Sequence, residues 1–376
     1  MSRSSVRTLT CFAGATIALV AAALHAGPLN PPAGPVASTA KPLGEIEPRT
    51  AVNATNTPGD ATSLFKITQP GSYYLTGNIT GVAGKHGIVI TANNVTLDLG
   101  GFELAGVPGM GGFNGIYAPT NIFPKNTVIR NGSIRGWGDQ GIAYNGSYNA
   151  IVTDVRVSEN VGTGMVMGFS SIIERCTAVS NGFGGISGSN GCTLTNCTAA
   201  LNTGSGMGTS AGGVITGCTS SNNTGGGISG GGSTITGCTA VSNSTYGISA
   251  DAGTTVSNCI SGSNTVDGIL VGTRCAVLNN TCSSNTGANV HVTGSGNRIE
   301  GNSVMGGGFG YQLTGTGNTL FRNTCTGSSP KWNIAAGNAI GMIVLAGTNP
   351  SIISSNGSGS PTNTLGSSEP NANFAY

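Results

Sequence analysis

Charged residues are scarce in this chain. Only 7% of its 376 residues are Asp, Glu, Lys or Arg, whereas about 25% is usual in soluble domains. The formal net charge is +2, and no cluster of Lys or Arg occurs, so the sequence does not predict a nucleic-acid-binding protein. No apolar run of about 20 residues follows residue 26, which argues against a membrane-spanning protein despite the low charge.

Common catalytic and metal-binding motifs are missing as well. The chain has no phosphate-binding loop, no Ser-His-Asp series and no zinc pattern. His86 and His291 have no acidic or cysteine neighbour at ligand spacing, so we interpret them as surface or turn histidines. We therefore expect neither a metal site nor a cofactor.

The amino terminus has the pattern of a secretory signal in residues 1–26. Two arginines precede an apolar run, and Ala26 is a small residue at the predicted cleavage point. Residues 27–58 contain seven prolines and no periodicity, which is typical of a linker or extended lead-in. We expect a secreted, periplasmic or cell-surface protein without a membrane span after cleavage.

A repeat of about 21 residues dominates the rest of the chain. Asparagine, cysteine and apolar residues recur in phase over more than a hundred residues, which indicates one structural unit stacked on itself. The asparagine series is Asn160, Asn181, Asn202, Asn223, Asn243, Asn264 and Asn285. The cysteine series is Cys176, Cys197, Cys218, Cys238 and Cys259. The apolar series is Met165, Ile186, Met207, Ile228, Ile248, Ile269 and Val290.

Within one repeat the pattern is that of short strands. Cys197, Ala199 and Leu201 alternate with polar residues, as in a strand with one buried face, and no helical period occurs. Parallel, in-register coils bring each residue beside its equivalent in the next repeat. The pattern therefore predicts an all-β fold, a single-stranded parallel β-helix of about 12 coils. We place it at residues 59–350, followed by a Ser/Asn/Gly-rich cap or tail at 351–376.

The chain resembles the right-handed parallel β-helix proteins of the pectate-lyase-like superfamily. The asparagine series, Gly-apolar pairs such as Gly185-Ile186 and the opening stretch 69–75 carry the likeness, which covers roughly residues 60–350. The resemblance implies a right-handed coil and a buried asparagine ladder. It does not imply one activity, because the superfamily contains lyases, hydrolases, epimerases and proteins with no known reaction.

The catalytic motifs that the resemblance would imply are absent. Pectate lyases have a calcium site of clustered Asp, but Asp251 and Asp267 fall at different phases of the repeat. Polygalacturonases carry Asn-Thr-Asp, Asp-Asp, Gly-His-Gly and Arg-Ile-Lys, and none of these occurs.

The cysteine series is predicted to be a column of free, buried thiols. A straight column cannot surround a metal ion tetrahedrally. Disulfides between neighbouring coils remain an alternative, although parallel Cβ vectors hold the Cβ atoms too far apart for the usual geometry. The alignment also predicts three ion pairs between successive coils: Asp98 with Arg130, Glu103 with Arg135, and Asp154 with Arg175.

One irregular corner is the candidate functional site. Trp137 lies between Arg135 and Asp139, one coil before Glu159, and Tyr144 and Tyr148 follow. An aromatic ring beside Arg and carboxylates is suited to sugar contact, and Asp139 with Glu159 are candidates for acid–base catalysis. The leading hypothesis is a non-catalytic structural or glycan-binding protein, whose partner is a polysaccharide or cell-surface glycan. The alternative is a polysaccharide lyase or glycoside hydrolase that uses this corner.

Overall fold

The computed structural model describes residues 47–345, 352–354 and 370–375. The chain divides into two compact units, residues 1–48 and 49–376. The predicted signal peptide 1–26, most of the lead-in 27–58 and most of the tail 351–376 lie outside the described residues. Among the residues that are described, no helix is long and apolar enough to cross a membrane.

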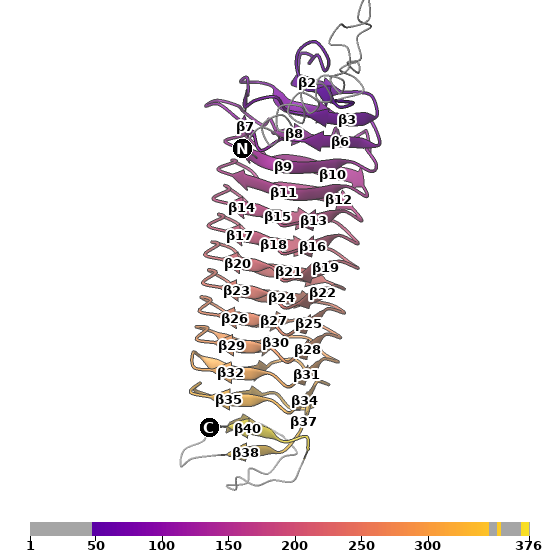
Figure 1. The fold of residues 1–376 in the computed structure, drawn as a ribbon. Coiled ribbons are helices and arrows are strands. Elements are labelled where there is room, and N and C mark those ends of the chain that lie inside the picture. Colours follow the sequence, from indigo (N-terminus) through magenta and orange to yellow (C-terminus); the bar gives the residue numbers. More distant parts are fainter. Residues whose placement is uncertain (1–46, 346–351, 355–369, 376) are drawn as a thin grey trace, which may run out of the picture. The chain divides into compact units, whose positions relative to one another are not determined.

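The second unit is an all-β parallel β-helix, as the repeat predicts (Figure 1). A regular coil contains three short strands, and each strand pairs in parallel with its equivalent in the next coil, as Met207 does with Ile228. The strands form one sheet of 14 strands and one of 26.

The 14-stranded sheet takes one strand from each coil. Its members are β2 (Ser63–Ile67), β5 (His86–Ile90), β8 (Ile116–Tyr117), β10 (Ile142–Tyr148), β12 (Met165–Phe169), β15 (Ile186–Gly188), β18 (Met207–Thr209), β21 (Ile228–Gly231), β24 (Ile248–Asp251), β27 (Ile269–Val271), β30 (Ala288–Val292), β33 (Phe309–Leu313), β36 (Trp332–Ile334) and β39 (Ile352–Ser354).

The 26-stranded sheet holds the other two strands of the regular coils. Its members are β1 (Thr50–Ala51), β3 (Gly71–Tyr74), β4 (Ile79–Thr80), β6 (Val95–Asp98), β7 (Glu103–Ala105), β9 (Val128–Arg135), β11 (Ile151–Ser158), β13 (Ile172–Glu174), β14 (Thr177–Val179), β16 (Thr193–Thr195), β17 (Thr198–Ala200), β19 (Val214–Thr216), β20 (Thr219–Ser221), β22 (Thr234–Thr236), β23 (Thr239–Val241), β25 (Thr255–Ser257), β26 (Ile260–Gly262), β28 (Ala276–Leu278), β29 (Thr281–Ser283), β31 (Arg298–Glu300), β32 (Ser303–Met305), β34 (Thr319–Phe321), β35 (Thr324–Thr326), β37 (Ala339–Ile340), β38 (Ile343–Leu345) and β40 (Asn373–Ala375).

The fold has about 14 coils, so the prediction of about 12 was too low. The first coils carry long connections that hide the repeat: Asp98 and Arg130 lie on neighbouring coils but are 32 residues apart in sequence. The fold also extends beyond the predicted limits of 59–350. β1 pairs with β3 at one end, and β40 pairs with β35 and β38 at the other.

A single left-handed residue makes each sharp corner. Asn196 (φ 52°) precedes Cys197, and Leu201 (φ 57°) precedes Asn202. Asn tolerates this conformation and Gly adopts it freely, whereas Leu does so at a cost. The residue after each bend then directs its side chain inward, which explains why Cys197 and Asn202 are both buried.

The asparagine ladder is present over its whole predicted length. Each side-chain Nδ2 donates to Oδ1 of the asparagine in the next coil, at 2.9–3.1 Å from Asn160 to Asn285. The same Oδ1 also accepts a backbone N–H, as Asn223 does from Asn202. The ladder thus satisfies backbone and side-chain groups inside the coil, as buried polar groups require.

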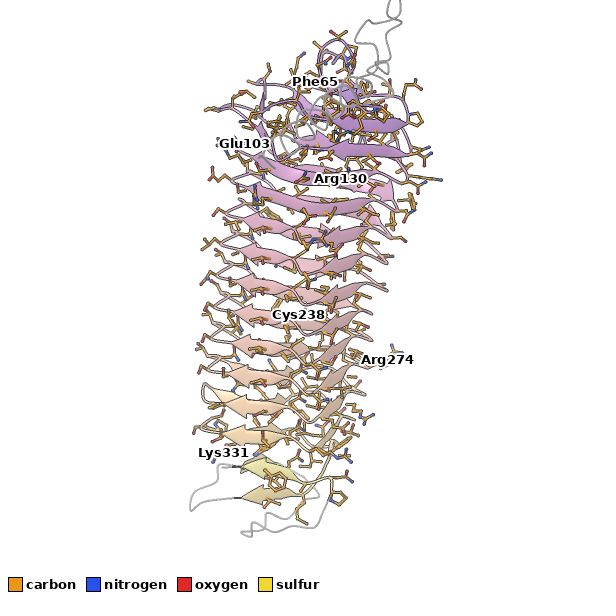
Figure 2. All side chains as sticks on the ribbon, viewed as in Figure 1. Phe65, Glu103, Arg130, Cys238, Arg274 and Lys331 are labelled. Carbon is orange, nitrogen blue, oxygen red and sulfur yellow. The ribbon has the colours of Figure 1, made fainter. Side chains whose placement is uncertain are left out.

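All nine cysteines in the described residues are buried and free. Figure 2 labels one of them, Cys238, within the stack of coils. Within the series Cys176–Cys259, a thiol takes the same role as an asparagine: Sγ of Cys218 accepts from the N–H of Cys197 and donates to a carbonyl oxygen. Below Cys259 the column continues as Asn280, which accepts the N–H of Cys259 at 2.9 Å. In the same way, Asn297 accepts the N–H of Cys275. Two further asparagine ladders, which the sequence did not predict, thus occupy the last coils. They are Asn280–Asn302–Asn323–Asn373 and Asn297–Asn318–Asn338.

The three predicted ion pairs are confirmed. The shortest nitrogen–oxygen distances are 3.0 Å for Arg130 with Asp98, 2.6 Å for Arg135 with Glu103 and 2.8 Å for Arg175 with Asp154. All three guanidinium groups are well exposed, so solvent screens each pair and the pairs contribute little to stability.

Candidate functional site

The outer face of the 14-stranded sheet carries two hollows. The first, the N-terminal cleft, has a volume of about 310 Å³. The second, the central groove, has a volume of about 300 Å³. The cleft is lined by His86, Gly112, Asn114, Tyr117, Ala118, Thr120, Asp139, Gln140, Ala143 and Asn145. The groove is lined by Thr163, Phe183, Gly184, Gly185, Ile186, Ser187, Gly188, Ser205, Met207, Gly208, Thr209, Ser210 and Ser229.

His86 begins β5 and holds a fixed orientation in the N-terminal cleft. Its ring stacks on Tyr117, with centroids 4.1 Å apart, and meets the edge of Phe113 at 4.9 Å. Its Nδ1 accepts the backbone N–H of Asn114 at 3.0 Å, so the neutral ring carries its proton on Nε2. Burial lowers the pKa of His86, opposed by the charge of Asp60. His86 is therefore not the turn or surface histidine that the sequence suggested, but a neutral donor in a cleft.

Asp139 lines the same cleft. Burial raises the pKa of its carboxyl group. Its backbone N–H donates to the carbonyl oxygen of Phe113 at 3.1 Å. The side-chain oxygen of Asn114 accepts the backbone N–H of Gln140 at 2.8 Å. A half-buried carboxyl with a raised pKa in the same cleft as an oriented imidazole is a pattern found at binding and catalytic sites.

Trp137 and Tyr144 are fully buried, which corrects their prediction as ligand-binding residues. The indole Nε1 of Trp137 donates to the carbonyl of Leu104 at 3.1 Å, and its backbone N–H donates to Asn160. Its ring packs so closely on Gly87 that a Cβ there would approach it to 2.8 Å. A ring inside the coil cannot stack on a sugar. Trp137 instead packs beneath Gly87, the residue that follows His86.

The remaining members of the predicted corner do not converge. Arg135 is paired with Glu103 and lines a separate hollow of about 550 Å³ with Met110 and Val161. Glu159 is exposed at a left-handed turn (φ 56°) and is not among the residues that line the cleft. Asp139 and Glu159 therefore do not share one cavity, and the structure does not support them as a catalytic pair.

Tyr148 is exposed and forms part of an aromatic pair at the end of β10. Its ring stacks on Phe169 of the next coil, with centroids 5.1 Å apart and an interplanar angle of 21°. The ammonium group of Lys125 lies 6.0 Å from the centre of the Tyr148 ring. These rings keep 42% and 36% of their surface exposed, so the pair offers an apolar platform to solvent.

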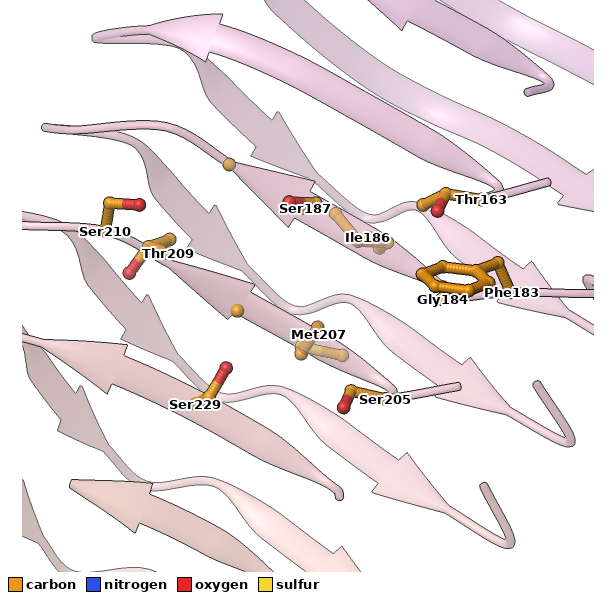
Figure 3. A pocket seen from close by; sticks show the side chains of 13 residues that line it. Thr163, Phe183, Gly184, Ile186, Ser187, Ser205, Met207, Thr209, Ser210 and Ser229 are labelled. Atoms are coloured by element: carbon orange, nitrogen blue, oxygen red, sulfur yellow. The ribbon is translucent and has the colours of Figure 1, made fainter. Parts of the chain in front are cut away.

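The central groove has a floor of small residues. Ser187 and Gly208 lie side by side on β15 and β18, and Ser229 follows on β21. Figure 3 shows the ring of Phe183 on one side of the groove and Ser210 on the other. Phe183 is 69% exposed, so this groove also has an aromatic ring at its edge.

The two hollows belong to one continuous row of outward residues. Ala143 of the cleft pairs with Val166, Val166 with Ser187, and Ser187 with Gly208. Only the coil that contains β12 separates the cleft from the groove. A chain-like ligand laid along the row would therefore contact both hollows.

Farther along the same face lies an Asp–His pair that the sequence reading missed. Asp267 accepts the N–H of Ala288 at 2.8 Å, and its other carboxylate oxygen lies 2.8 Å from Nδ1 of His291. Asp267 is buried and His291 is partly exposed. His291 therefore has an acidic neighbour after all, which corrects its interpretation as an isolated histidine. Within the described residues, no group of three or more His, Cys, Asp or Glu is placed to hold a metal ion.

Sequence and structure comparisons identify relatives of the fold. The family model for the right-handed β-helix region matches residues 66–199, 140–276 and 186–304. No curated protein matches the chain in sequence.

Among solved structures, the chain is similar to two mannuronan C-5 epimerase A-modules from Azotobacter vinelandii. The AlgE4 module has a TM-score of 0.53 and 16% identity, with 77% of this chain and 91% of that chain covered. The AlgE6 module has a TM-score of 0.54 and 17% identity, with 81% and 89% covered. The tailspike protein of E. coli bacteriophage HK620, in complex with a pentasaccharide, has a TM-score of 0.55 and 11% identity, with 84% and 72% covered.

Proposed function

The chain belongs to the right-handed β-helix family, and from this premise we propose that it binds a linear polysaccharide along the outer face of its 14-stranded sheet. The observation that carries the proposal is the row from Ala143 to Gly208, which joins the N-terminal cleft to the central groove. An elongated polymer can fill both hollows at once, whereas a compact ligand can fill only one.

The chemistry of the two hollows fits sugar units. Hydroxyl and amide side chains such as Ser187, Ser205 and Gln140 both donate and accept hydrogen bonds. Phe183 lines the central groove with an exposed ring, and the exposed Tyr148–Phe169 pair lies at the end of β10, the strand whose Ala143 and Asn145 line the cleft. Such rings can stack on the C–H face of a sugar. The names of the solved neighbours, a mannuronan epimerase and a tailspike with a pentasaccharide, point to the same class of partner.

The proposed role is binding without catalysis, by a protein located outside the cytoplasm. The separation of Asp139 from Glu159 favours this role, because a glycosidase of the usual kind needs two carboxyl groups on either side of one bond. The location rests on the predicted signal at residues 1–26.

A binding panel of neutral and acidic polysaccharides tests the proposal. Ser187→Trp places a large ring in the central groove, and Thr219→Trp places the same ring on β20 of the other sheet. We expect Ser187→Trp to weaken polysaccharide binding at least about tenfold, and Thr219→Trp to leave it unchanged. Equal affinities of the two variants would contradict the proposal.

A second candidate function is acid–base processing of the polymer in the N-terminal cleft. The observation in its favour is that burial raises the pKa of Asp139 while it lowers the pKa of His86, so both are neutral over a wider range than usual. Polymer cleavage or epimerisation that is abolished by Asp139→Asn would establish this function. If the wild type and Asp139→Asn both bind the polymer but the wild type neither cleaves nor epimerises it, the processing function is excluded.

A further inference from the structure

We propose that the polysaccharide bound by this face is uncharged, a polymer of neutral hexoses or N-acetylhexosamines rather than a polyuronate or a sulfated glycan. This inference rests on the proposed function and names the chemical class of its ligand. It follows from the distribution of charge over the faces of the coil.

Neither hollow is lined by a lysine or an arginine. Recognition of a carboxylate or sulfate ester normally uses the forked guanidinium group of Arg or the ammonium group of Lys. Along the central groove the outward positions are instead Ser187, Gly208 and Ser229. An acidic sugar placed there would lose water from its charged group without gaining a cation, which is costly.

The arginines of the regular coils lie outside both hollows, and three of them form ion pairs. Arg175 pairs with Asp154 on the 26-stranded sheet side, and Arg298 and Arg322 share Glu300. Arg274 projects from a corner of its coil (Figure 2). Lys125 is above the Tyr148 ring and outside the residues that line the cleft.

The charged side chain that lines the N-terminal cleft is acidic. Asp139 faces the N-terminal cleft, and no described cation forms an ion pair with it. A uronate in this cleft would meet a like charge at short range, in a partly desolvated site where such repulsion is strong. Asp139 therefore discriminates against acidic polymers, while its oxygens still accept hydrogen bonds from neutral sugar hydroxyls.

Affinity electrophoresis of the full chain compares hydroxyethyl cellulose, galactomannan and dextran with polygalacturonate and alginate. We expect at least one neutral polymer to bind, with an affinity that does not change between low and high salt. We expect both polyuronates to bind at least about tenfold more weakly. A polyuronate that binds the wild type as tightly as any neutral polymer, with salt-sensitive affinity, overturns the inference and leaves the proposed function standing. Failure of all five polymers to bind overturns the proposed function itself.

A charge-gain variant tests where the discrimination arises. Ser187→Lys adds a cation to the central groove, and Thr219→Lys adds one to β20 on the other sheet. We expect Ser187→Lys alone to acquire salt-sensitive polyuronate binding. Equal gains in both variants would show that net charge, and not the composition of the groove, sets the preference, and would overturn the inference.

Discussion

Asn223 and Asn243 are joined by a hydrogen bond of 3.0 Å from Nδ2 to Oδ1 in the middle of the buried ladder. Asn223 also donates to the carbonyl of Ala199 at 3.2 Å, and its Oδ1 accepts from both the backbone and the side chain of Asn202. One side chain thus connects three successive coils. Because it has no exposed surface, water cannot replace any of these bonds.

Replacing Asn223 with Leu should therefore cost much more stability than replacing an outward residue. The change leaves the amide groups of Asn202 without their acceptor, and each unsatisfied buried group costs about 1–3 kcal/mol. Thr219→Leu is the matched control, because Thr219 begins β20, the strand that directly precedes Asn223 in the same coil. Urea midpoints measure the difference, and two midpoints equally close to that of the wild type would show that the ladder does not stabilise the fold.

The cysteines should react only after unfolding. Nine cysteines of the described residues are buried and free, so a reagent cannot reach them in the folded protein, and burial raises the pKa of Cys192 and Cys282, which disfavours the reactive thiolate at those two positions. We expect almost no reaction of a thiol reagent with the native protein, and about nine thiols per chain after denaturation without reductant. A count of zero or one in the denatured protein would mean that the column is disulfide-bonded.

The two tryptophans should both report an apolar environment. Trp137 and Trp332 have no exposed surface and are the only tryptophans in the chain. We expect blue-shifted fluorescence, little quenching by acrylamide, and no added protection when a polysaccharide binds. Quenching as strong as that of free tryptophan, relieved by a bound polysaccharide, would instead place Trp137 at the surface.

The pH dependence of stability should differ in sign between two aspartates. Burial raises the pKa of Asp139, so its contribution favours the fold below the ordinary carboxyl pKa and is lost as the pH rises through the folded value. Asp139→Asn should therefore stabilise the protein at about pH 7 and show no gain at about pH 3.

Asp154 is the control with the opposite sign. The hydrogen-bonded guanidinium of Arg175 lowers the pKa of Asp154, so its contribution is present above the unfolded pKa and is lost as the pH falls through the folded value. Asp154→Asn should destabilise the protein at about pH 7, and the difference should disappear in acid. Denaturant midpoints of both variants across this range measure the two signs. A loss of stability in Asp139→Asn at neutral pH would contradict the assigned cause.

The repeat was sufficient to predict the coil, the main ladder and the ion pair of Asp154 with Arg175, because one register relates all of them. The other two ion pairs span a longer coil of 32 residues and required its asparagines to be aligned. Asn160 to Asn285 could be aligned by counting, and Asp154 lies 21 residues before Arg175. The additional ladders were missed because the cysteine column changes to asparagine at Asn280, so the residue type changes while the position in the coil does not.

The candidate site was harder to predict, because it depends on burial and on contacts between different positions of neighbouring coils. Trp137 was expected at a surface corner, yet Gly81, Gly87 and Gly115, which lie far from it in the sequence, leave room for its indole inside the coil. Asp267 and His291 are 24 residues apart, which does not match the repeat, so alignment could not bring them together. Asp139 was identified by its residue type, but His86, which lines the same cleft, comes from a strand more than 50 residues earlier.

Hydroxyl-radical footprinting with the tightest-binding polysaccharide tests the proposed binding face most directly. Phe183 is exposed and lines the central groove, and Tyr148 is exposed at the end of β10, whose Ala143 and Asn145 line the N-terminal cleft. Met305 is 55% exposed on β32 of the other sheet. We predict that the polysaccharide slows oxidation of both Phe183 and Tyr148 and leaves Met305 unchanged. Protection of Met305 without protection of Phe183 and Tyr148 would show that the polymer binds another face, and would contradict the account.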